Sequence, residues 1–302
     1  MLDTDTEMTP ADVLEDLPIS DWDGPFSPEL SARALEALEA GRVLLLPKLE
    51  FRLQPSEAGF LDPSIAAGDR KNISLDPGAT TCDATALEPG QAERLAAMMR
   101  RFSDQATALV EGLAPPYVGH LERARTSFRP VEIAGRTYSP RHDDRRLHVD
   151  AFPTRPMRGR RILRVFSNIA RDGAARDWRV GEPFAAFAEQ FVPRVRRPLP
   201  GSAFVLQALS LTKGRRSGYD EIMLSLHDQA KLDEAYQADA PKTPVAFPAG
   251  ATWLCFTDQV LHAALSGHSA LEQTFHLPVE AMARPERSPL KVLEKMTGRV
   301  LA

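Results

Sequence analysis

The hydrophobic positions of this chain follow two different patterns, one before and one after about residue 120. In the first part, apolar residues recur at helical spacing over residues 28–40 and 89–112. Ser27 can cap the first of these helices, with Pro28 at its first position. Between the helices, residues 42–47 form a short continuous apolar run that predicts a buried strand.

In the second part, short apolar segments separated by turn residues predict a series of strands. The predicted strands are 124–131, 135–139, 146–151, 161–169, 203–206, 243–247, 252–257, 262–264 and 273–279. Helices near 182–190 and 220–236 interrupt them, and Pro248-Ala249-Gly250 is predicted to be a tight turn between two antiparallel strands. This pattern favours a sandwich or barrel, so the predicted fold class is α+β and mainly β.

The start of the chain differs in composition from the rest. Residues 1–24 contain eight acidic residues, no Lys or Arg, and few large apolar side chains, which predicts an acidic disordered tail. The whole chain is 43% hydrophobic, which is enough for a packed core. We therefore predict that residues 25–302 form a single domain.

Cysteine use and hydropathy predict the compartment. Cys82 and Cys255 are the only cysteines, which is too few for a disulfide framework or a cysteine zinc site and favours a reducing compartment. The chain has no basic start followed by an apolar run, and no apolar stretch of the ~20 residues that cross a membrane. We predict a cytoplasmic protein, with peripheral contact to the inner membrane left open.

The net charge of −4 conceals a basic region. Residues 121–200 contain 18 Arg and 9 acidic residues. One interpretation is a solvated basic surface, and the other is a field that attracts an anionic substrate. Arginine suits bidentate binding of carboxylate or phosphate. No nucleic-acid partner is predicted.

His148 and Asp150 are the strongest candidate metal ligands. In a strand they would share one face, while Leu147 and Val149 would be buried on the other. His142 offers a competing His-x-Asp pattern, but no apolar neighbour would fix its orientation, so we prefer the later pair.

A second histidine would complete the two-histidine, one-carboxylate ligand set of non-haem Fe(II) oxygenases. His262 is the best candidate, because it follows a Pro/Gly turn, an apolar strand and a polar corner, and small residues come after it. Considered alone, His262 is equally consistent with an ordinary buried histidine.

Several segments together resemble the Fe(II)/2-oxoglutarate dioxygenases, and among these the hydroxylases of 3-deoxy-D-manno-oct-2-ulosonic acid (Kdo). They include His148-x-Asp150, the segment from Asp258 to His262, and Leu271-Glu272-Gln273-Thr274-Phe275. Further segments that carry the resemblance are residues 161–169, 70–74 and 288–294. The resemblance covers about residues 30–300. It implies a double-stranded β-helix, or jelly-roll, core and hydroxylation of Kdo at C3 to give Ko, on Kdo-containing lipid A.

The implied cofactors are Fe(II), 2-oxoglutarate as co-substrate and O2, with ascorbate as an optional reductant. The far carboxylate of 2-oxoglutarate needs a buried cation or several donors. Many relatives place an Arg about ten residues after the distal histidine, but this chain has Glu272 and Gln273 there. Alternation along 161–169 puts Arg164 and Asn168 on one face. If that face looks inward, we predict that Arg164 binds this carboxylate, assisted by Gln273 and Asn168; the alternative is that Arg164 lies on the outer face among solvated arginines.

The acceptor site is predicted less sharply. Arg141, Arg146 and Arg155 flank the metal pair and are the candidate substrate-binding residues. Residues 288–302 are predicted to form a helix that either docks on the domain or rests on an anionic membrane. The alternatives to a Kdo hydroxylase are a related hydroxylase of another small anionic or protein substrate, and a non-catalytic jelly roll that binds carbohydrate. The oligomeric state is not predicted.

Overall fold

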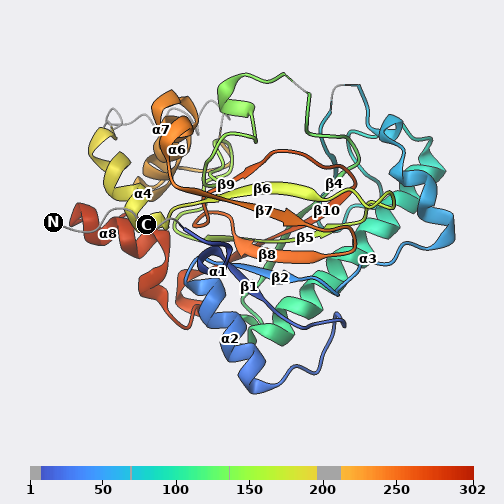
Figure 1. Cartoon of the computed structure of the whole chain (residues 1–302), viewed down its shortest axis with the longest axis horizontal. Helices are drawn as coiled ribbons and strands as arrows, with labels where there is room; N and C mark the ends of the chain where they lie inside the picture. The colour runs from blue at the N-terminus through green and yellow to red at the C-terminus, as the bar shows by residue number, and fades with distance from the viewer. Residues whose placement is uncertain (1–7, 69, 136, 196–211) are drawn as a thin grey trace.

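Two β-sheets form the centre of the molecule (Figure 1). The computed structural model describes residues 8–68, 70–135, 137–195 and 212–302. The strands within these residues are β1 (Leu14–Asp16), β2 (Val43–Leu46), β3 (Ile73–Leu75), β4 (Glu122–Arg129), β5 (Arg161–Asn168), β6 (Arg176–Gly181), β7 (Lys242–Phe247), β8 (Thr252–Phe256), β9 (His262–Ala264) and β10 (Ala270–Leu277). One sheet has the order β1-β2-β8-β5-β10-β4-β3 and the other the order β7-β6-β9. The predicted α+β fold class is confirmed.

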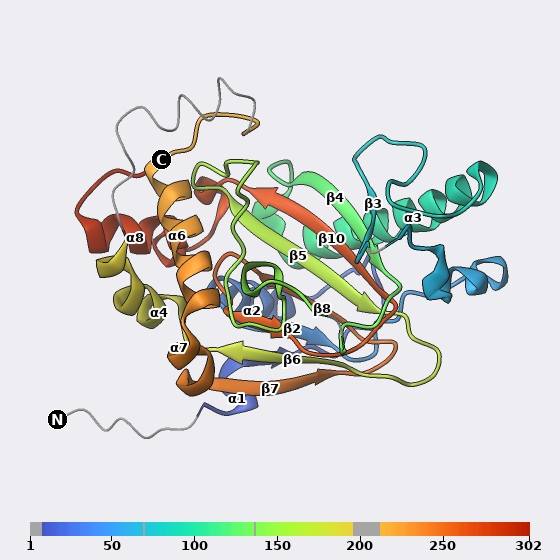
Figure 2. The ribbon, with the colours of Figure 1, turned by 90° about the horizontal axis from the view of Figure 1, so that it is seen from above.

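Helices surround the sheets on one face and at one end (Figures 1 and 2). The helices are α1 (Pro10–Val13), α2 (Pro28–Glu39), α3 (Pro89–Leu113), α4 (Phe184–Phe191), α6 (Gly218–Leu232), α7 (Glu234–Asp239) and α8 (Pro289–Thr297). Short 3-10 turns are η1 (Pro55–Leu61), η2 (Pro63–Ile65), η3 (Pro115–Tyr117), η4 (Pro140–His142), η5 (Val192–Arg194), η6 (Val279–Ala281) and η7 (Pro285–Arg287). Helices α2 and α3 lie beneath the larger sheet, while α4, α6, α7 and α8 gather at one end (Figure 1).

The space between the two sheets is filled by aromatic rings. Trp253 on β8 stacks on Phe247 of β7 with ring centroids 4.1 Å apart, and Trp178 on β6 meets Phe166 of β5 edge-on. All four rings are buried. Since two of them come from each sheet, this cluster holds the sheets together and supports the polar residues that lie beside it.

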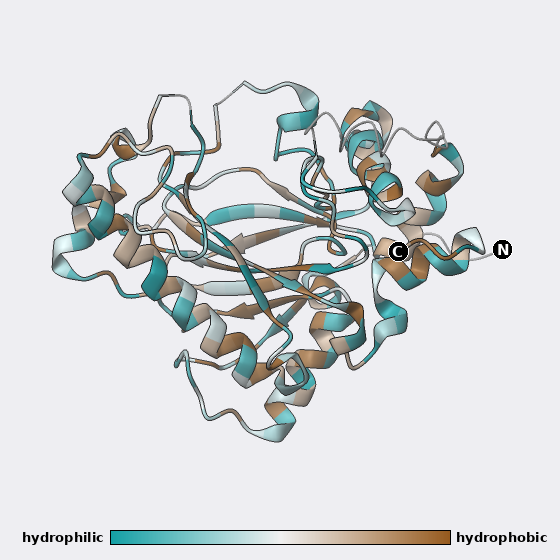
Figure 3. Ribbon diagram, turned by 180° about the vertical axis from the view of Figure 1, so that it is seen from behind, coloured by the Kyte–Doolittle hydropathy of each residue, from teal (hydrophilic) through white to brown (hydrophobic). Residues whose placement is uncertain are grey.

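The strand register shows which side chains face into this space. Arg164 lies opposite Thr274 of β10 and Cys255 of β8, and Phe166 lies opposite Glu272 and Trp253. Directly opposed residues share a face, so Arg164 and Glu272 both face the interior between the sheets. The prediction that Arg164 faces inward is confirmed. The other face of the larger sheet packs on α3, whose apolar stripe is visible in Figure 3.

The predicted helix starts agree with the structure. Ser27 accepts a hydrogen bond from the Leu30 amide at the start of α2, and Ser288 accepts one from the Lys291 amide at the start of α8. Each serine precedes a proline at the first helical position, an arrangement that satisfies a free amide without losing a hydrogen bond. The sequence therefore contained a local signal for both helices.

The prediction of a disordered tail over residues 1–24 is wrong for its described part. Strand β1 pairs in parallel with β2, and Leu17 and Ile19 are 1% and 3% exposed. The acidic composition concealed a few apolar residues that turn inward, namely Val13, Leu17, Ile19 and Trp22. Glu15, one of the acidic residues, bonds to Arg33 and Arg42.

Three further predictions need correction. The turn at residues 248–250 joins strands that belong to different sheets, because β7 pairs only with β6 while β8 lies in the larger sheet. Residues 137–139 are not in a strand, and residues 146–151 form one isolated bridge instead of a strand. Strand β6 was not predicted. The predicted strand 203–206 lies outside the described residues.

Both cysteines are buried and free, as expected for a chain without disulfides. Among the described residues, no helix is both long and apolar enough to cross a membrane.

Candidate metal centre

Two backbone hydrogen bonds bring His148 and His262 opposite one another. The His148 amide donates to the His262 carbonyl (3.1 Å), and the His262 amide donates to the His148 carbonyl (2.9 Å). Next along the chain, the Asp150 amide donates to the Thr257 carbonyl (2.8 Å). Leu147 and Val149 are buried on the opposite side, as the alternation predicted. Backbone pairing thus sets the positions of all three side chains.

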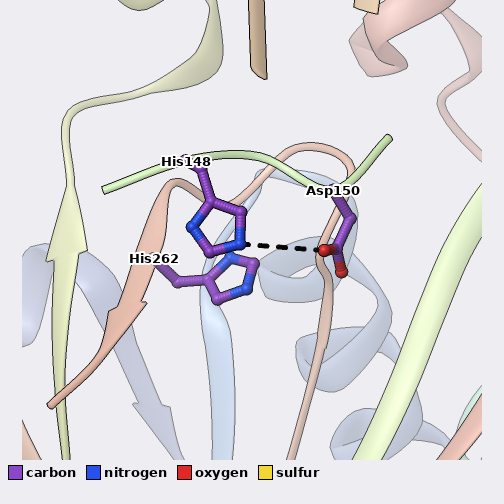
Figure 4. Close-up of side chains that lie close together, drawn as sticks. All are labelled: His148, Asp150 and His262. Carbon is purple, nitrogen blue, oxygen red and sulfur yellow. Dashed lines mark ion pairs between the residues drawn. The ribbon is translucent and has the colours of Figure 1, made fainter. Parts of the chain in front are cut away.

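The side chains of His148, Asp150 and His262 converge on one point (Figure 4). One donor atom from each lies within 4.8 Å of the others, and His148 Nε2 is 3.9 Å from Asp150 Oδ1. Within the described part of the chain, no other group of histidine, cysteine and carboxylate side chains is arranged to hold a metal ion. His142, the rival candidate, lies in η4 and bonds to the Ser139 hydroxyl.

Both imidazoles present Nε2 toward the convergence point. His148 Nδ1 lies 2.7 Å from the Arg146 carbonyl and His262 Nδ1 lies 2.9 Å from the Val260 carbonyl, so each Nδ1 carries the proton and donates it. Such a bond fixes the tautomer and leaves Nε2 as the free donor, as metal-binding histidines require. Burial lowers the pKa of both rings, which keeps them neutral.

Asp150 completes the donor set as a carboxylate. Burial alone would raise the pKa of Asp150, but the Arg164 guanidinium outweighs this effect and holds the pKa well below its usual range. Arg164 Nη2 lies 3.2 Å from Asp150 Oδ2, on the side away from His148. Two neutral imidazoles and one carboxylate on one side of a point are the ligands of non-haem Fe(II) oxygenases. The residues present therefore fit such an ion.

A network of buried charges continues from Asp150 across the interior. Arg164 also pairs with Glu272 (3.1 Å), and Glu272 accepts two hydrogen bonds from Arg129, at 2.7 and 3.0 Å. Burial favours the protonated form of Glu272, but the two guanidinium groups outweigh it and lower the pKa of Glu272. Glu272 is thus an anion held between two cations.

Arg176 on β6 is more deeply buried than Arg129 and Arg164, and it has no carboxylate partner among the described residues. It is 3% exposed, its Nη1 donates to the Gly267 carbonyl at 3.3 Å, and its Nε has no partner. Burial, together with the Arg129 charge, lowers the pKa of Arg176 to about 9. Trp178, two residues along β6, stacks on His262 and has an unpaired buried Nε1. Arg176 Nε and Trp178 Nε1 are therefore buried donors that lack acceptors among the described residues, and the Trp178 ring lies against His262.

A cavity of about 300 Å³ opens beside this network. Arg129, Arg164 and Glu272 form its inner part, and Phe152 and Arg155 lie on the chain that continues from Asp150. Because Arg164 lines the cavity and contacts Asp150, the cavity and the triad belong to one site.

Comparison with known proteins identifies the family. The model of the 3-deoxy-D-manno-oct-2-ulosonic acid (Kdo) hydroxylases matches residues 21–300. The chain belongs to the Kdo hydroxylase family. It is 46% identical to the Kdo hydroxylase KdoO, a non-heme Fe(II) alphaketoglutarate-dependent dioxygenase, in its crystal structure with alphaketoglutarate and Fe(III). That match has a TM-score of 0.93 and covers 96% of this chain and 97% of the other.

Another crystal structure of KdoO, in complex with cobalt(II), is 47% identical with a TM-score of 0.93, and the match covers 95% of this chain and 97% of that one. A KdoO complex with succinate and Fe(III) matches at 46% identity with a TM-score of 0.91, over 95% of this chain and 97% of that one. No curated protein matches the chain. The resemblance found in the sequence is confirmed.

The other predicted co-substrate residues of this Kdo hydroxylase lie elsewhere. Gln273 is on the opposite face of β10 from Glu272, and it bonds to the Thr126 hydroxyl and the Ala124 carbonyl. Asn168 donates to the carbonyls of Ala174 and Phe247 at the far end of β5. The polar groups of both side chains are already paired within the protein, so neither Gln273 nor Asn168 is available to bind the co-substrate.

The three candidate substrate arginines are also separated by the fold. Arg155 lines the cavity. Arg141 pairs with Asp228 on α6, and Arg146 pairs with Glu234 on α7, so neither lines the cavity. Proximity in sequence to His148 and Asp150 did not predict which arginines line the cavity. The chain before His148 runs away from the cavity, whereas the chain after Asp150 runs along it.

Four residues of the site were missed. Arg129, Arg176 and Trp178 were not considered. Glu272 was mentioned only because it stands in the region where many relatives have an arginine. Alternation of Arg176, Trp178 and Val180 with Asp177 and Arg179 was a strand signal, but two inward positions are not simple aliphatic residues. An ionic network cannot be read from hydropathy alone, because its members look like surface residues.

Proposed function

We propose that this chain hydroxylates C3 of Kdo in a Kdo-containing lipid A precursor, giving Ko. Membership of the family makes it an Fe(II)- and 2-oxoglutarate-dependent dioxygenase that uses O2. The observation that carries the proposal is the convergence of His148, Asp150 and His262 next to a cavity lined by arginines. A protein that only binds carbohydrate would not need this donor set.

His148 Nε2, Asp150 Oδ1 and His262 Nε2 are the atoms we assign to the metal. Bound Fe(II), with 2-oxoglutarate and O2, supplies the oxidising power to hydroxylate an unactivated C–H bond. The chain itself supplies orientation: the Arg146 and Val260 carbonyls hold the imidazole tautomers, and Arg164 holds the Asp150 carboxylate. The stacked Trp178 ring excludes water from one side of His262.

We assign the far carboxylate of 2-oxoglutarate to a group of donors instead of Arg164 alone. Arg164 is already shared between Asp150 and Glu272, so its charge is largely compensated. Arg176 and the Trp178 indole have unpaired buried N–H groups on the same side of β6, and Arg129 lies close enough to lower the pKa of Arg176. A dianionic ligand would satisfy these donors and the excess positive charge.

The two facing sheets and the short strands support a double-stranded β-helix, or jelly-roll, as the finer description of the fold. We propose one domain, which includes β1 because this strand completes the edge of the larger sheet.

We place the reaction in the cytoplasm, with the acceptor at the inner membrane. Leu290 and Leu293 of α8 are buried against the domain, which supports the docking interpretation of this helix over a membrane-bound one.

The proposed activity is tested with purified protein, Fe(II), ascorbate and 2-oxoglutarate, with and without a Kdo-containing lipid A precursor. We expect succinate formation to rise on addition of the acceptor, and the product to gain one oxygen atom by mass spectrometry. An acceptor-independent rate in protein that binds Fe(II) normally would contradict the assigned substrate and leave only the enzyme class.

The co-substrate assignment is tested with Arg176→Met. Anaerobic titration of the Fe(II) protein with 2-oxoglutarate, followed by the visible absorption of the complex, should show affinity at least about tenfold weaker, the loss expected for a charge-assisted hydrogen bond. Arg179→Met on the exposed face of β6 is the matched control. Equal affinity in a folded Arg176→Met protein that binds Fe(II) would refute the assignment.

A further inference from the structure

The cavity beside the triad has two parts with different chemistry. Its inner part is the network of Arg129, Arg164 and Glu272, whose charges pair with one another and with Asp150. Other polar residues line the same cavity without belonging to this network, and we call five of them the outer wall. The outer wall consists of Asn72, Ser74, Arg125, Arg155 and Lys213.

The outer wall carries positive charge that the protein does not neutralise. Arg125 pairs with Asp76 at 2.9 Å. The side chains of Arg155 and Lys213 make no hydrogen bond or ion pair with any residue in the ranges the structure describes. Both nevertheless lie near Asp76, which already has a partner. Among the described residues, two cations without a partner thus face one cavity, and the single acid that lines it, Glu272, is held by other arginines.

Neutral polar groups line the same cavity as these cations. The Asn72 side-chain oxygen is buried and accepts no hydrogen bond. Ser74, Ser127 and Thr274 add hydroxyl groups to the same lining. Burial lowers the pKa of His276, another lining residue, to about 4, so this imidazole is neutral at neutral pH. Such a lining suits a ligand with several hydroxyl groups.

We infer that the outer wall binds an anionic group of the acceptor, a carboxylate or a phosphate, through Arg155 and Lys213, while Asn72 accepts a hydrogen bond from an acceptor hydroxyl. This inference rests on the proposed function, because it names the subsite that would hold the acid sugar or its phosphorylated carrier. The separation of inner and outer cations gives each anion its own partners. Arg176 and Arg129 serve the co-substrate, and Arg155 and Lys213 serve the acceptor.

The double variant Arg155→Ala/Lys213→Ala tests the inference. We expect the KM for a Kdo-containing lipid A precursor to rise by at least about tenfold, because the variant loses both charge-assisted contacts with the acceptor anion. The KM for 2-oxoglutarate and kcat at saturating acceptor should stay unchanged. Arg123→Ala is the matched control, because Arg123 lies on β4 but pairs with Asp104 on the opposite face.

Free Kdo, which has a carboxylate but no phosphate, distinguishes the two anions. An effect of the double variant on both acceptors identifies the carboxylate as the bound group, and an effect on the lipid A precursor alone identifies the phosphate. An unchanged KM for the precursor, or an equal rise in the KM for 2-oxoglutarate, overturns the inference while the proposed function stands.

Equilibrium binding separates failure of the inference from failure of the proposed function. If the wild type hydroxylates neither acceptor, the proposed function fails, and binding of the precursor to the Fe(II)–2-oxoglutarate protein is measured without O2. Binding that the double variant weakens supports the subsite. No binding by the wild type, or equal binding by both proteins, overturns it.

Discussion

Asp150 is the residue on which the metal position and the charge network meet. Its Oδ1 faces His148 and its Oδ2 faces Arg164. A carboxylate shared in this way stays ionised and keeps its orientation when no metal is bound, because the guanidinium occupies the other oxygen. We therefore expect the donor set to be formed before the ion arrives.

Replacement of single donors tests the three assigned ligands. In His148→Ala, Asp150→Ala and His262→Ala, we expect Fe(II) affinity and acceptor-dependent succinate formation to fall by more than about 100-fold, because loss of an outer partner alone costs roughly 10–100-fold. The control is His142→Ala, which removes the rival histidine in η4. Calorimetric titration with Fe(II) or Co(II) measures the affinity. Normal metal binding by any of the three variants would remove that residue from the site.

His276 predicts a dependence of stability on pH. Its pKa is about 4 in the folded protein, against about 6.5 for an unperturbed histidine. The unfolded chain therefore binds more protons between these values, so the free energy of unfolding rises from pH 4 to pH 6.5 and is constant above that, a contribution on the order of 3 kcal/mol.

Denaturant unfolding of the wild type and of His276→Gln at pH 5 and pH 7.5 measures this contribution. The wild type should lose more stability than the variant on acidification, since glutamine does not titrate. Parallel losses in the two proteins would show that His276 does not titrate as described.

For single residues, the sequence identified those that a local pattern along the chain points to. His148 and Asp150 were found from alternation, His262 from the strand and corner before it, and Arg164 from its face of β5. Gln273 was assigned to the site by its distance after His262, but the register of β10 turns it to the other face of the sheet, where it is buried. Arg176 could not be found, because a buried unpaired arginine is recognised only from its surroundings.

Strand β1 shows how an element can form from an unpromising segment. Three residues pair with β2 in parallel, and the chain then buries Leu17 and Ile19. Composition alone predicted disorder here, because the average over the segment hid the side on which its apolar residues lie.

A core substitution in this segment should therefore destabilise the whole domain. Leu17→Ala removes a side chain that is 1% exposed, and we expect a loss of about 2–4 kcal/mol in the free energy of unfolding. Ser20→Ala, an exposed position three residues later, is the control and should change it by less than about 0.5 kcal/mol. Chemical denaturation provides the measurement, and indistinguishable midpoints for the two variants would mean that the segment does not pack.

The other elements were predictable to the extent that their signals were local. Capping serines and prolines marked α2 and α8, and a long apolar stripe marked α3. The segment that carries His148 was predicted as a strand, but it bonds to β9 at a single bridge. The partner of a strand is set by tertiary structure, so its length and sheet are not encoded in the segment itself.

At the scale of the molecule, charge is distributed unevenly. Glu15 and Asp16 lie on β1 at the edge of the larger sheet, whereas the arginines of residues 121–200 include those of the cavity. The excess of arginine over acidic residues in this region is a property of the sequence. It did not distinguish arginines that pair on the surface, such as Arg141 and Arg146, from those inside the cavity.

The open cations of the cavity predict a salt dependence. Raising the ionic strength from about 0.01 M to about 0.15 M shortens the screening length from roughly 30 Å to roughly 8 Å. We expect kcat/KM for the anionic acceptor to fall several-fold, with little change in kcat, because screening weakens capture and not the chemical step. Steady-state kinetics in NaCl measures this, with sucrose of equal osmolarity as the control. An unchanged kcat/KM would exclude electrostatic attraction of the acceptor.

The reciprocal hydrogen bonds between His148 and His262 also have a consequence for how the protein folds. They join segments that are distant in sequence, so we expect this contact to form late in folding, because long-range contacts are slow to form. A metal ion that binds the native arrangement alone will stabilise the folded state by mass action without speeding its formation. Metal capture during refolding should therefore report the last stage of assembly, and the ion should act mainly by slowing the unfolding of the finished protein.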